Sequence, residues 1–145
     1  MTQPTCKERI EENLKNRIKD LERMYYSDDE VERDEFYDYG LSFDYVAPDT
    51  FSDVMFADHS TSLQKQGFFR YQLSWGGPSD EFRIYTNPDF TPHCIEYVYQ
   101  DWFDGAALVC NEIDHPVVWD ICTGIFTDCG YFESSFNKSK GQNDN

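Results

Sequence analysis

Long apolar runs are missing from this chain of 145 residues. No stretch approaches the roughly 20 apolar residues that a membrane-spanning helix needs, and the first residues show no signal-peptide apolar segment. Basic residues are scarce too: 12 Lys and Arg stand against 28 Asp and Glu, a formal net charge of −16. Because phosphate is bound mainly by Lys and Arg, neither direct nucleic-acid binding nor an anionic membrane surface is expected. We expect a cytoplasmic protein.

Metal-binding cysteine motifs are also lacking. The 5 cysteines include no Cys-x-x-Cys pair, which zinc sites commonly use. We expect reduced thiols that mostly fill the core, with no metal and no other cofactor. The cysteines are Cys6, Cys94, Cys110, Cys122 and Cys129.

No catalytic constellation stands out. The three histidines, His59, His93 and His115, lie in or beside expected loops without a recognisable nucleophile or ligand set. Glu96, Asp101 and Asp104 sit near a strand end and a turn, where they suit a divalent cation or acid–base chemistry. The simpler interpretation is that they are surface acids. We therefore expect no enzymatic activity.

The 17% of aromatic residues indicates a folded chain despite its charge. Thr5 and Glu8 form a capping-box pattern, and the apolar spacing that follows predicts a helix over about 6–26. Ser27–Glu30 resembles the cap and first turn of a second helix that runs to about Tyr37, and Gly40 ends it. Alternation over 41–45 predicts a strand.

The clearest β pattern follows an irregular loop over 48–67. Alternating apolar residues predict a hairpin over 69–84 with its turn at 76–80, a third strand over 95–99 and a last strand over 106–110. A closing helix is expected to be capped by Asp114, to carry Pro116 in its first turn and to stop at Gly130. Its expected apolar face comprises Val118, Ile121, Cys122, Ile125, Phe126 and Cys129.

This order of elements predicts an α+β fold. An antiparallel sheet of four or five strands would be packed by an N-terminal helix pair and a C-terminal helix. Residues 1–136 are expected to form a single domain, and residues 137–145 a disordered polar tail.

The acidic residues are concentrated in two blocks. Residues 28–64 hold eleven acids and one base, Arg33, and residues 84–137 hold nine acids with no Lys or Arg. A solvated helical face is the ordinary explanation, but such self-repulsion costs stability and exceeds what solubility needs. Aromatic residues interleaved with the acids would supply binding hot spots. We expect partner binding by Asp28, Asp29, Glu30, Glu32, Asp34, Glu35 and Asp38, with Glu96, Asp101 and Asp104 as a second patch.

Three segments carry a family resemblance: Tyr71–Arg83, Ile95–Ala106 and Tyr39–Pro48. They resemble small acidic proteins encoded by bacteriophages and conjugative elements. Such proteins are similar in kind to anti-CRISPR and antirestriction proteins, which block host nucleases by direct binding. The resemblance implies a location in the bacterial host cell and supplies no catalytic residue.

The leading hypothesis is an anti-defence protein that binds a basic, nucleic-acid-binding host complex, such as a CRISPR effector or a restriction enzyme. Its acidic surface would mimic nucleic acid and block the site for DNA or RNA. The alternatives are an antirestriction protein, or an adaptor that bridges proteins through the aromatic face of its sheet without mimicry. An enzyme that acts on a defence component or a signalling nucleotide is the third class. The sequence does not indicate the oligomeric state.

Overall fold

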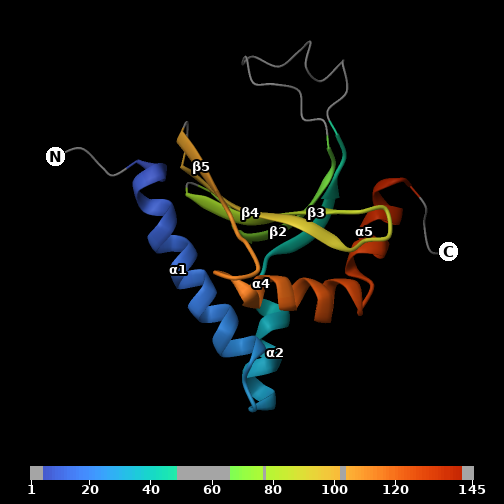
Figure 1. Ribbon diagram of the computed structural model, residues 1–145, viewed down its shortest axis with the longest axis horizontal. Coiled ribbons are helices and arrows are strands. Elements are labelled where there is room, and N and C mark those ends of the chain that lie inside the picture. The colour runs from blue at the N-terminus through green and yellow to red at the C-terminus, as the bar shows by residue number, and fades with distance from the viewer. Residues whose placement is uncertain (1–4, 49–65, 77, 102–103, 142–145) are drawn as a thin grey trace, which may run out of the picture.

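The computed structural model describes residues 5–48, 66–76, 78–101 and 104–141 and shows the α+β fold that the sequence predicts. One antiparallel sheet carries helices on one of its faces (Figure 1). The helical elements are α1 (Cys6–Tyr25), α2 (Glu30–Tyr39), α4 (Pro116–Ile121), the π-helix η1 (Cys122–Thr127) and α5 (Tyr131–Ser139). The strands are β1 (Ser42–Val46), β2 (Phe68–Ser74), β3 (Ser79–Thr86), β4 (Pro92–Asp101) and β5 (Asp104–Val109).

The N-terminal helix pair follows from local signals. The Thr5 side chain accepts a hydrogen bond from the Glu8 backbone, and the Glu8 carboxylate accepts one from the Thr5 N–H, which confirms the capping box at α1. Residues at helical spacing, Ile10, Leu14 and Leu21 among them, bury one stripe of α1. In α2 the Asp29 side chain caps the helix by accepting from the Val31 N–H.

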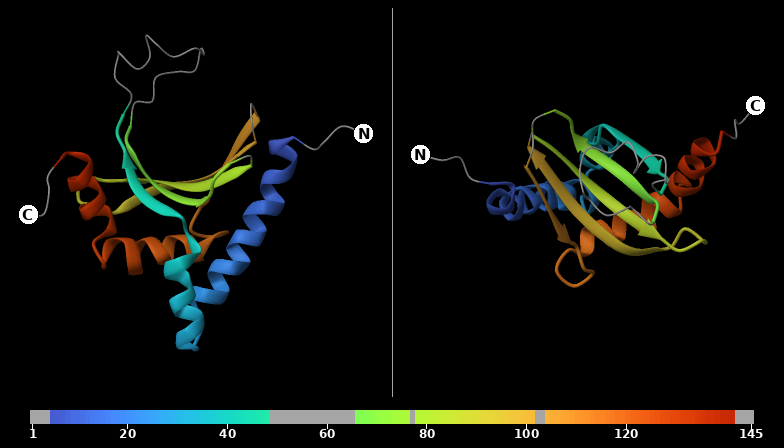
Figure 2. Two further views of the ribbon diagram at one scale, coloured as in Figure 1. Left: turned by 180° about the vertical axis from the view of Figure 1, so that it is seen from behind. Right: turned by 90° about the horizontal axis from the view of Figure 1, so that it is seen from above.

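The sheet is a meander whose strands pair in sequence order, β1-β2-β3-β4-β5, all antiparallel. Successive side chains on a strand point to opposite faces. Phe69, Tyr71, Phe82 and Tyr97 are buried toward the helices, whereas Arg83 lies on the face away from them. Figure 2 shows this second face from above, with the helices behind the strands. Most of the predicted loop over 48–67 lies outside the described residues.

The C-terminal helical region differs from the expected single helix. His115, not Asp114, is the N-cap residue of α4, because the Asn111 side chain accepts from the N–H groups of Ile113 and Asp114 in a preceding turn. Pro116 occupies the first turn as predicted. A π-helix then inserts extra residues per turn. The other residues of the expected apolar face are buried, but Cys129 lies in the turn after η1 and is exposed.

A further helix, α5, follows Gly130, which adopts a left-handed conformation with φ 78°. The sequence analysis did not predict it, although Phe132 and Phe136 at four-residue spacing were a signal for it. Residues 137–139, expected in the polar tail, belong to its last turn. Phe132 is buried against Phe69, with ring centroids 4.7 Å apart, so α5 closes one end of the core.

The described helices include none that is long and apolar enough to cross a membrane.

Candidate partner-binding face

The exposed acids of α2 form a stripe along one side of the helix. Glu30, Asp34 and Asp38 are exposed and follow one another at four-residue intervals, so they lie on neighbouring turns. In the part of the chain that the structure describes, none of the three forms an ion pair. The stripe is therefore available to a partner.

The remaining acids of the first predicted patch are partly used within the molecule. Arg23 of α1 pairs with Glu32 at 3.1 Å and with Glu35 at 3.0 Å. Asp29 is the cap of α2, and Asp28 before it is exposed. These contacts anchor one side of α2 to α1 and leave its acidic stripe facing outward.

The second predicted patch is not part of the same surface. Asp101 pairs with Arg9, and Asp104 accepts a hydrogen bond from the Cys6 N–H at 2.7 Å, a contact that lowers the pKa of Asp104. Both acids lie beside the first turn of α1, whereas α2 lies at the other end of that helix (Figure 1). Glu96 points to the sheet face away from the helices, where burial and its hydrogen bond raise the pKa of Tyr85 to about 12.

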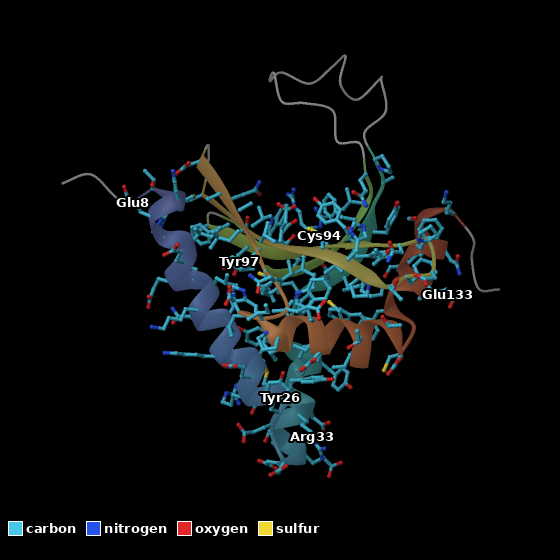
Figure 3. All side chains as sticks on the ribbon, viewed as in Figure 1. Glu8, Tyr26, Arg33, Cys94, Tyr97 and Glu133 are labelled. Atoms are coloured by element: carbon cyan, nitrogen blue, oxygen red, sulfur yellow. The ribbon has the colours of Figure 1, made fainter. Side chains whose placement is uncertain are left out.

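Two other acids of the second block lie near the C-terminal end of α1. The hydroxyl of Tyr26 donates to the Asp120 carboxylate, and the Tyr25 hydroxyl donates to the Asp120 carbonyl at 3.1 Å. The pKa of Tyr25 is raised by burial and by the nearby charges of Asp120 and Asp128. Both acids are exposed. Tyr25 and Tyr26 thus connect Asp120 to the C-terminal end of α1, from which the chain continues into α2 (Figure 3, labels Tyr26 and Arg33).

We define the acidic face as the exposed, unpaired acids of α2 together with those of the α4–η1 segment: Glu30, Asp34, Asp38, Asp120 and Asp128. Asp120 and Asp128 were not expected there, because they are 82 or more positions away from Asp38 in the chain. Only the packing of α1 against α4 brings them near.

A groove lined with aromatic rings lies beside this face, between α2 and β1 on one side and η1 and α5 on the other. It consists of three adjoining cavities of 350, 170 and 340 Å³. The first two share Phe36 and Tyr37 as walls, and the second and third share Phe43 and Tyr131. We call this the aromatic groove.

The aromatic residues expected at a binding rim divide into two groups. Tyr37 is 58% exposed and lies at the mouth of the groove, whereas Phe36, Tyr97 and Tyr99 are buried in the core. Trp102 and Phe103, which are also interleaved with the acids of the second block, lie outside the described residues. Tyr37 therefore offers ring surface at the groove, while Trp75, 80% exposed, and Tyr26, 50% exposed, offer it elsewhere.

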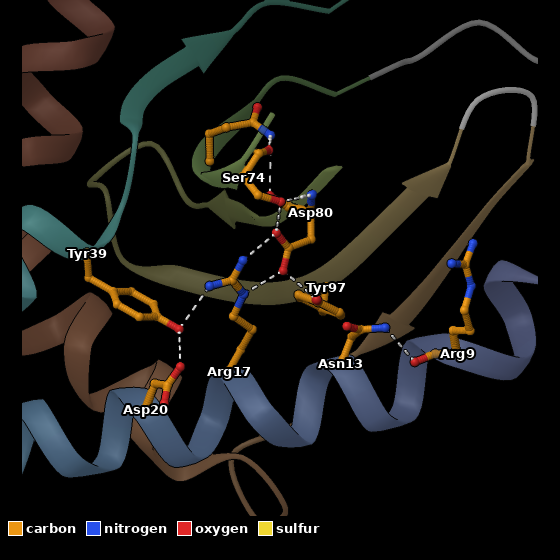
Figure 4. Close-up of polar contacts among 9 residues, drawn as sticks. Arg9, Asn13, Arg17, Asp20, Tyr39, Ser74, Asp80 and Tyr97 are labelled. Carbon is orange, nitrogen blue, oxygen red and sulfur yellow. Dashed lines mark hydrogen bonds and ion pairs between the residues drawn. The ribbon is translucent and has the colours of Figure 1, made fainter. Parts of the chain in front are cut away.

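A buried polar network connects α1 to the sheet (Figure 4). Asp80 of β3 accepts two hydrogen bonds from the Arg17 guanidinium, at 2.7 and 2.9 Å, and others from the hydroxyls of Ser74 and Tyr97. Burial alone would raise the pKa of Asp80, but these hydrogen bonds outweigh it and lower the pKa. The network joins α1 to three strands of the sheet.

The same guanidinium positions the end of α2. Arg17 also donates to the Tyr39 hydroxyl at 3.0 Å, and that hydroxyl donates to the Asp20 carboxylate at 2.7 Å. Burial, opposed by Arg17 and assisted by Asp20, raises the pKa of Tyr39 to about 12. Because Tyr39 is the last residue of α2, these bonds set where the acidic stripe lies relative to α1.

A larger cavity of 480 Å³ lies elsewhere, between α1 and β5. Lys15 and Lys19 line it together with Glu11, Glu22 and Asp114, so charges of both signs alternate around it. It shows no preference for a ligand of one charge, unlike the surroundings of the aromatic groove.

Comparison with known proteins provides no relative: no protein-family model, no curated protein and no solved structure matches this chain. Among the described residues, no group of three or more His, Cys, Asp or Glu is arranged to hold a metal ion.

Proposed function

We propose that this chain is a non-enzymatic anti-defence protein of a phage or mobile element. Its acidic face would occupy the positively charged nucleic-acid site of a host defence complex, with a CRISPR effector as the leading target and a restriction enzyme as the alternative. The observation that carries the proposal is the unpaired stripe of Glu30, Asp34 and Asp38, extended by Asp120 and Asp128 from the second acidic block.

The spacing of the stripe suits a basic channel. Four residues of α-helix advance about 6 Å, and each strand of duplex DNA carries one charge per about 3.4 Å of duplex axis. A helix that lies along this axis therefore presents one carboxylate for roughly every second phosphate of one strand. Clustered charge of one sign also accelerates association with a basic surface and makes the affinity depend on salt.

An adaptor without mimicry is the competing function. The aromatic face of the sheet is unsuitable for it, because Phe69, Phe82 and Tyr97 are covered by the helices. Among the described residues, the aromatic groove offers such an adaptor a surface. Its contacts would persist at high salt, whereas binding by the acidic face would weaken steeply.

Charge reversal tests the proposal. The variant Glu30→Lys/Asp34→Lys/Asp38→Lys should lose capture of a host complex that duplex DNA displaces from the unmodified protein. A control, Glu11→Lys/Glu12→Lys/Glu112→Lys, changes the net charge equally but at exposed acids in the first half of α1 and before α4. The control should retain capture.

The measurement is a pull-down from the bacterial host with mass spectrometry, repeated at rising salt and with competing DNA. Equal capture by both variants, or capture that neither salt nor DNA weakens, would exclude mimicry by the acidic face.

A further inference from the structure

We propose that the middle cavity of the aromatic groove binds one arginine side chain that the basic partner presents. This inference rests on the proposed function, because it assigns a specific anchor to the same partner. The cavity would then be a binding hot spot beside the acidic face. Charge alone discriminates little between one basic partner and another, so such a hot spot adds specificity.

The first observation is a buried hydroxyl without a partner. Tyr71 lines the cavity and is only 7% exposed, and its hydroxyl forms no hydrogen bond with any described residue. It lies beside Gly40, another wall residue, where an added Cβ would come within 2.2 Å of the Tyr71 ring. A buried polar group without a partner destabilises the fold, so a ligand that enters the cavity deeply enough to reach this covered hydroxyl would satisfy it by donating a hydrogen bond.

The second observation is the chemistry of the walls. Phe126 is at the centre of the ring cluster: its centroid lies 4.5 Å from Phe43, 5.3 Å from Tyr71 and 5.3 Å from Tyr131. Phe36 completes the cluster at 6.1 Å from Tyr71. Aromatic faces attract cations, and a flat guanidinium stacks on them better than an ammonium group does.

The third observation is charge. None of the described residues that line this cavity is Lys or Arg, and Arg33 lines the neighbouring cavity. Asp38 follows the wall residue Tyr37 directly in the chain, and the acidic stripe of α2 continues from it. A cation entering the groove is therefore attracted by the rings and by Glu30 and Asp34, which line the neighbouring cavity.

The volume of the middle cavity suits a single side chain. The cavity of 170 Å³ is smaller than the roughly 300–1,000 Å³ typical of sites for drug-sized ligands. It holds the volume of about five or six water molecules, at about 30 Å³ each. A guanidinium group with part of its stem is of this size, whereas a nucleotide is not.

The experiment is an NMR titration with three probes: N-acetyl-arginine N-methylamide and the matching citrulline and lysine compounds. Citrulline has the shape of arginine without its charge. The arginine probe should bind about tenfold more tightly than the citrulline probe and more tightly than lysine. The amide signals that move should include Gly40, Tyr37 and Tyr131.

The variant Tyr71→Phe removes the hydroxyl and keeps the ring. It should weaken binding of the arginine probe about tenfold, because a hydrogen bond from a charged donor is lost. Its thermal midpoint should equal or exceed that of the unmodified protein, since the hydroxyl has no partner to lose. The variants Asp38→Asn and Glu12→Gln each remove one negative charge, the first next to the wall residue Tyr37 and the second on α1. Only Asp38→Asn should weaken binding of the arginine probe.

Equal binding of the arginine and citrulline probes would overturn the proposal, as would unchanged binding by Tyr71→Phe or signals that move only around the α1–β5 cavity. The two proposals can fail separately. If Tyr71→Phe keeps host capture and probe binding while reversal of the α2 acids abolishes capture, only the arginine pocket is wrong. If the arginine probe binds as described but no DNA-displaceable host complex is captured, only the proposed function is wrong.

Discussion

Removing the charge of Asp80 should destabilise the protein far more than the same change at a more exposed aspartate. Asp80 and Arg17 form a two-bond pair with side-chain exposures of 4% and 24%. Asp44 and Arg70 form a pair of the same geometry, with exposures of 43% and 34%. The variants Asp80→Asn and Asp44→Asn are therefore matched in chemistry and differ in burial.

The magnitudes follow from that difference. Removing one partner of a buried ion pair costs about 3–5 kcal/mol, because the other charge is left without compensation. Arg17 retains some access to water, so we expect about 3 kcal/mol for Asp80→Asn, or about 6–12 °C in thermal midpoint for a chain of this size. For Asp44→Asn we expect about 0.2–1 kcal/mol, as for exposed pairs.

Urea and thermal unfolding at pH 7 measure both changes. A pH series adds a second criterion. The folded-state pKa of Asp80 lies below its ordinary value of 3.8. The ionised carboxylate therefore stabilises the fold above that value, and its contribution is lost as the pH falls through the folded pKa. The stability difference between the unmodified protein and Asp80→Asn should shrink below about pH 4. Equal losses for the two variants, or a difference independent of pH, would refute this reasoning.

Two further predictions concern packing and thiol exposure. Gly40→Ala should lower stability by about 1–3 kcal/mol, as overpacking does, because its Cβ would overlap the Tyr71 ring. Gly105→Ala, whose Cβ would meet atoms no nearer than 3.5 Å, is the control in the same unfolding assay, and a smaller loss for Gly40→Ala than for the control would contradict the packing. Iodoacetamide should modify exposed Cys129 first and buried Cys122 last in the folded protein, as mass spectrometry of timed samples would record. Faster labelling of Cys122 would show that η1 is not packed as described.

Local patterns of the sequence were sufficient for most of the fold. The apolar spacing of α1, its capping box and the alternation in the strands each depend on residues within a few positions of one another. The short turns between β2, β3, β4 and β5 made neighbouring strands pair in order. The π-helix and α5 escaped prediction. An extra residue per turn leaves no clear signature, and Phe132 and Phe136 alone form a short pattern.

Local sequence patterns predicted only part of the candidate site. The acidic stripe of α2 is one helix and one charge run, so the sequence by itself determined that Glu30, Asp34 and Asp38 lie on neighbouring turns. Tertiary structure decided which other acids join them. It placed Asp120 against Tyr26 at the end of α1, and it used Asp101 and Asp104 to hold the first turn of α1.

The aromatic groove was decided by tertiary structure alone. Its walls come from α2, β1, β2, η1 and α5, and aromatic residues in such elements are ordinarily core. Whether a ring faces the interior or a cavity depends on how helices pack across the sheet, which spans most of the chain. Periodicity along the sequence therefore determined the elements and the charge they carry, whereas contacts between distant segments decided which surfaces a partner meets.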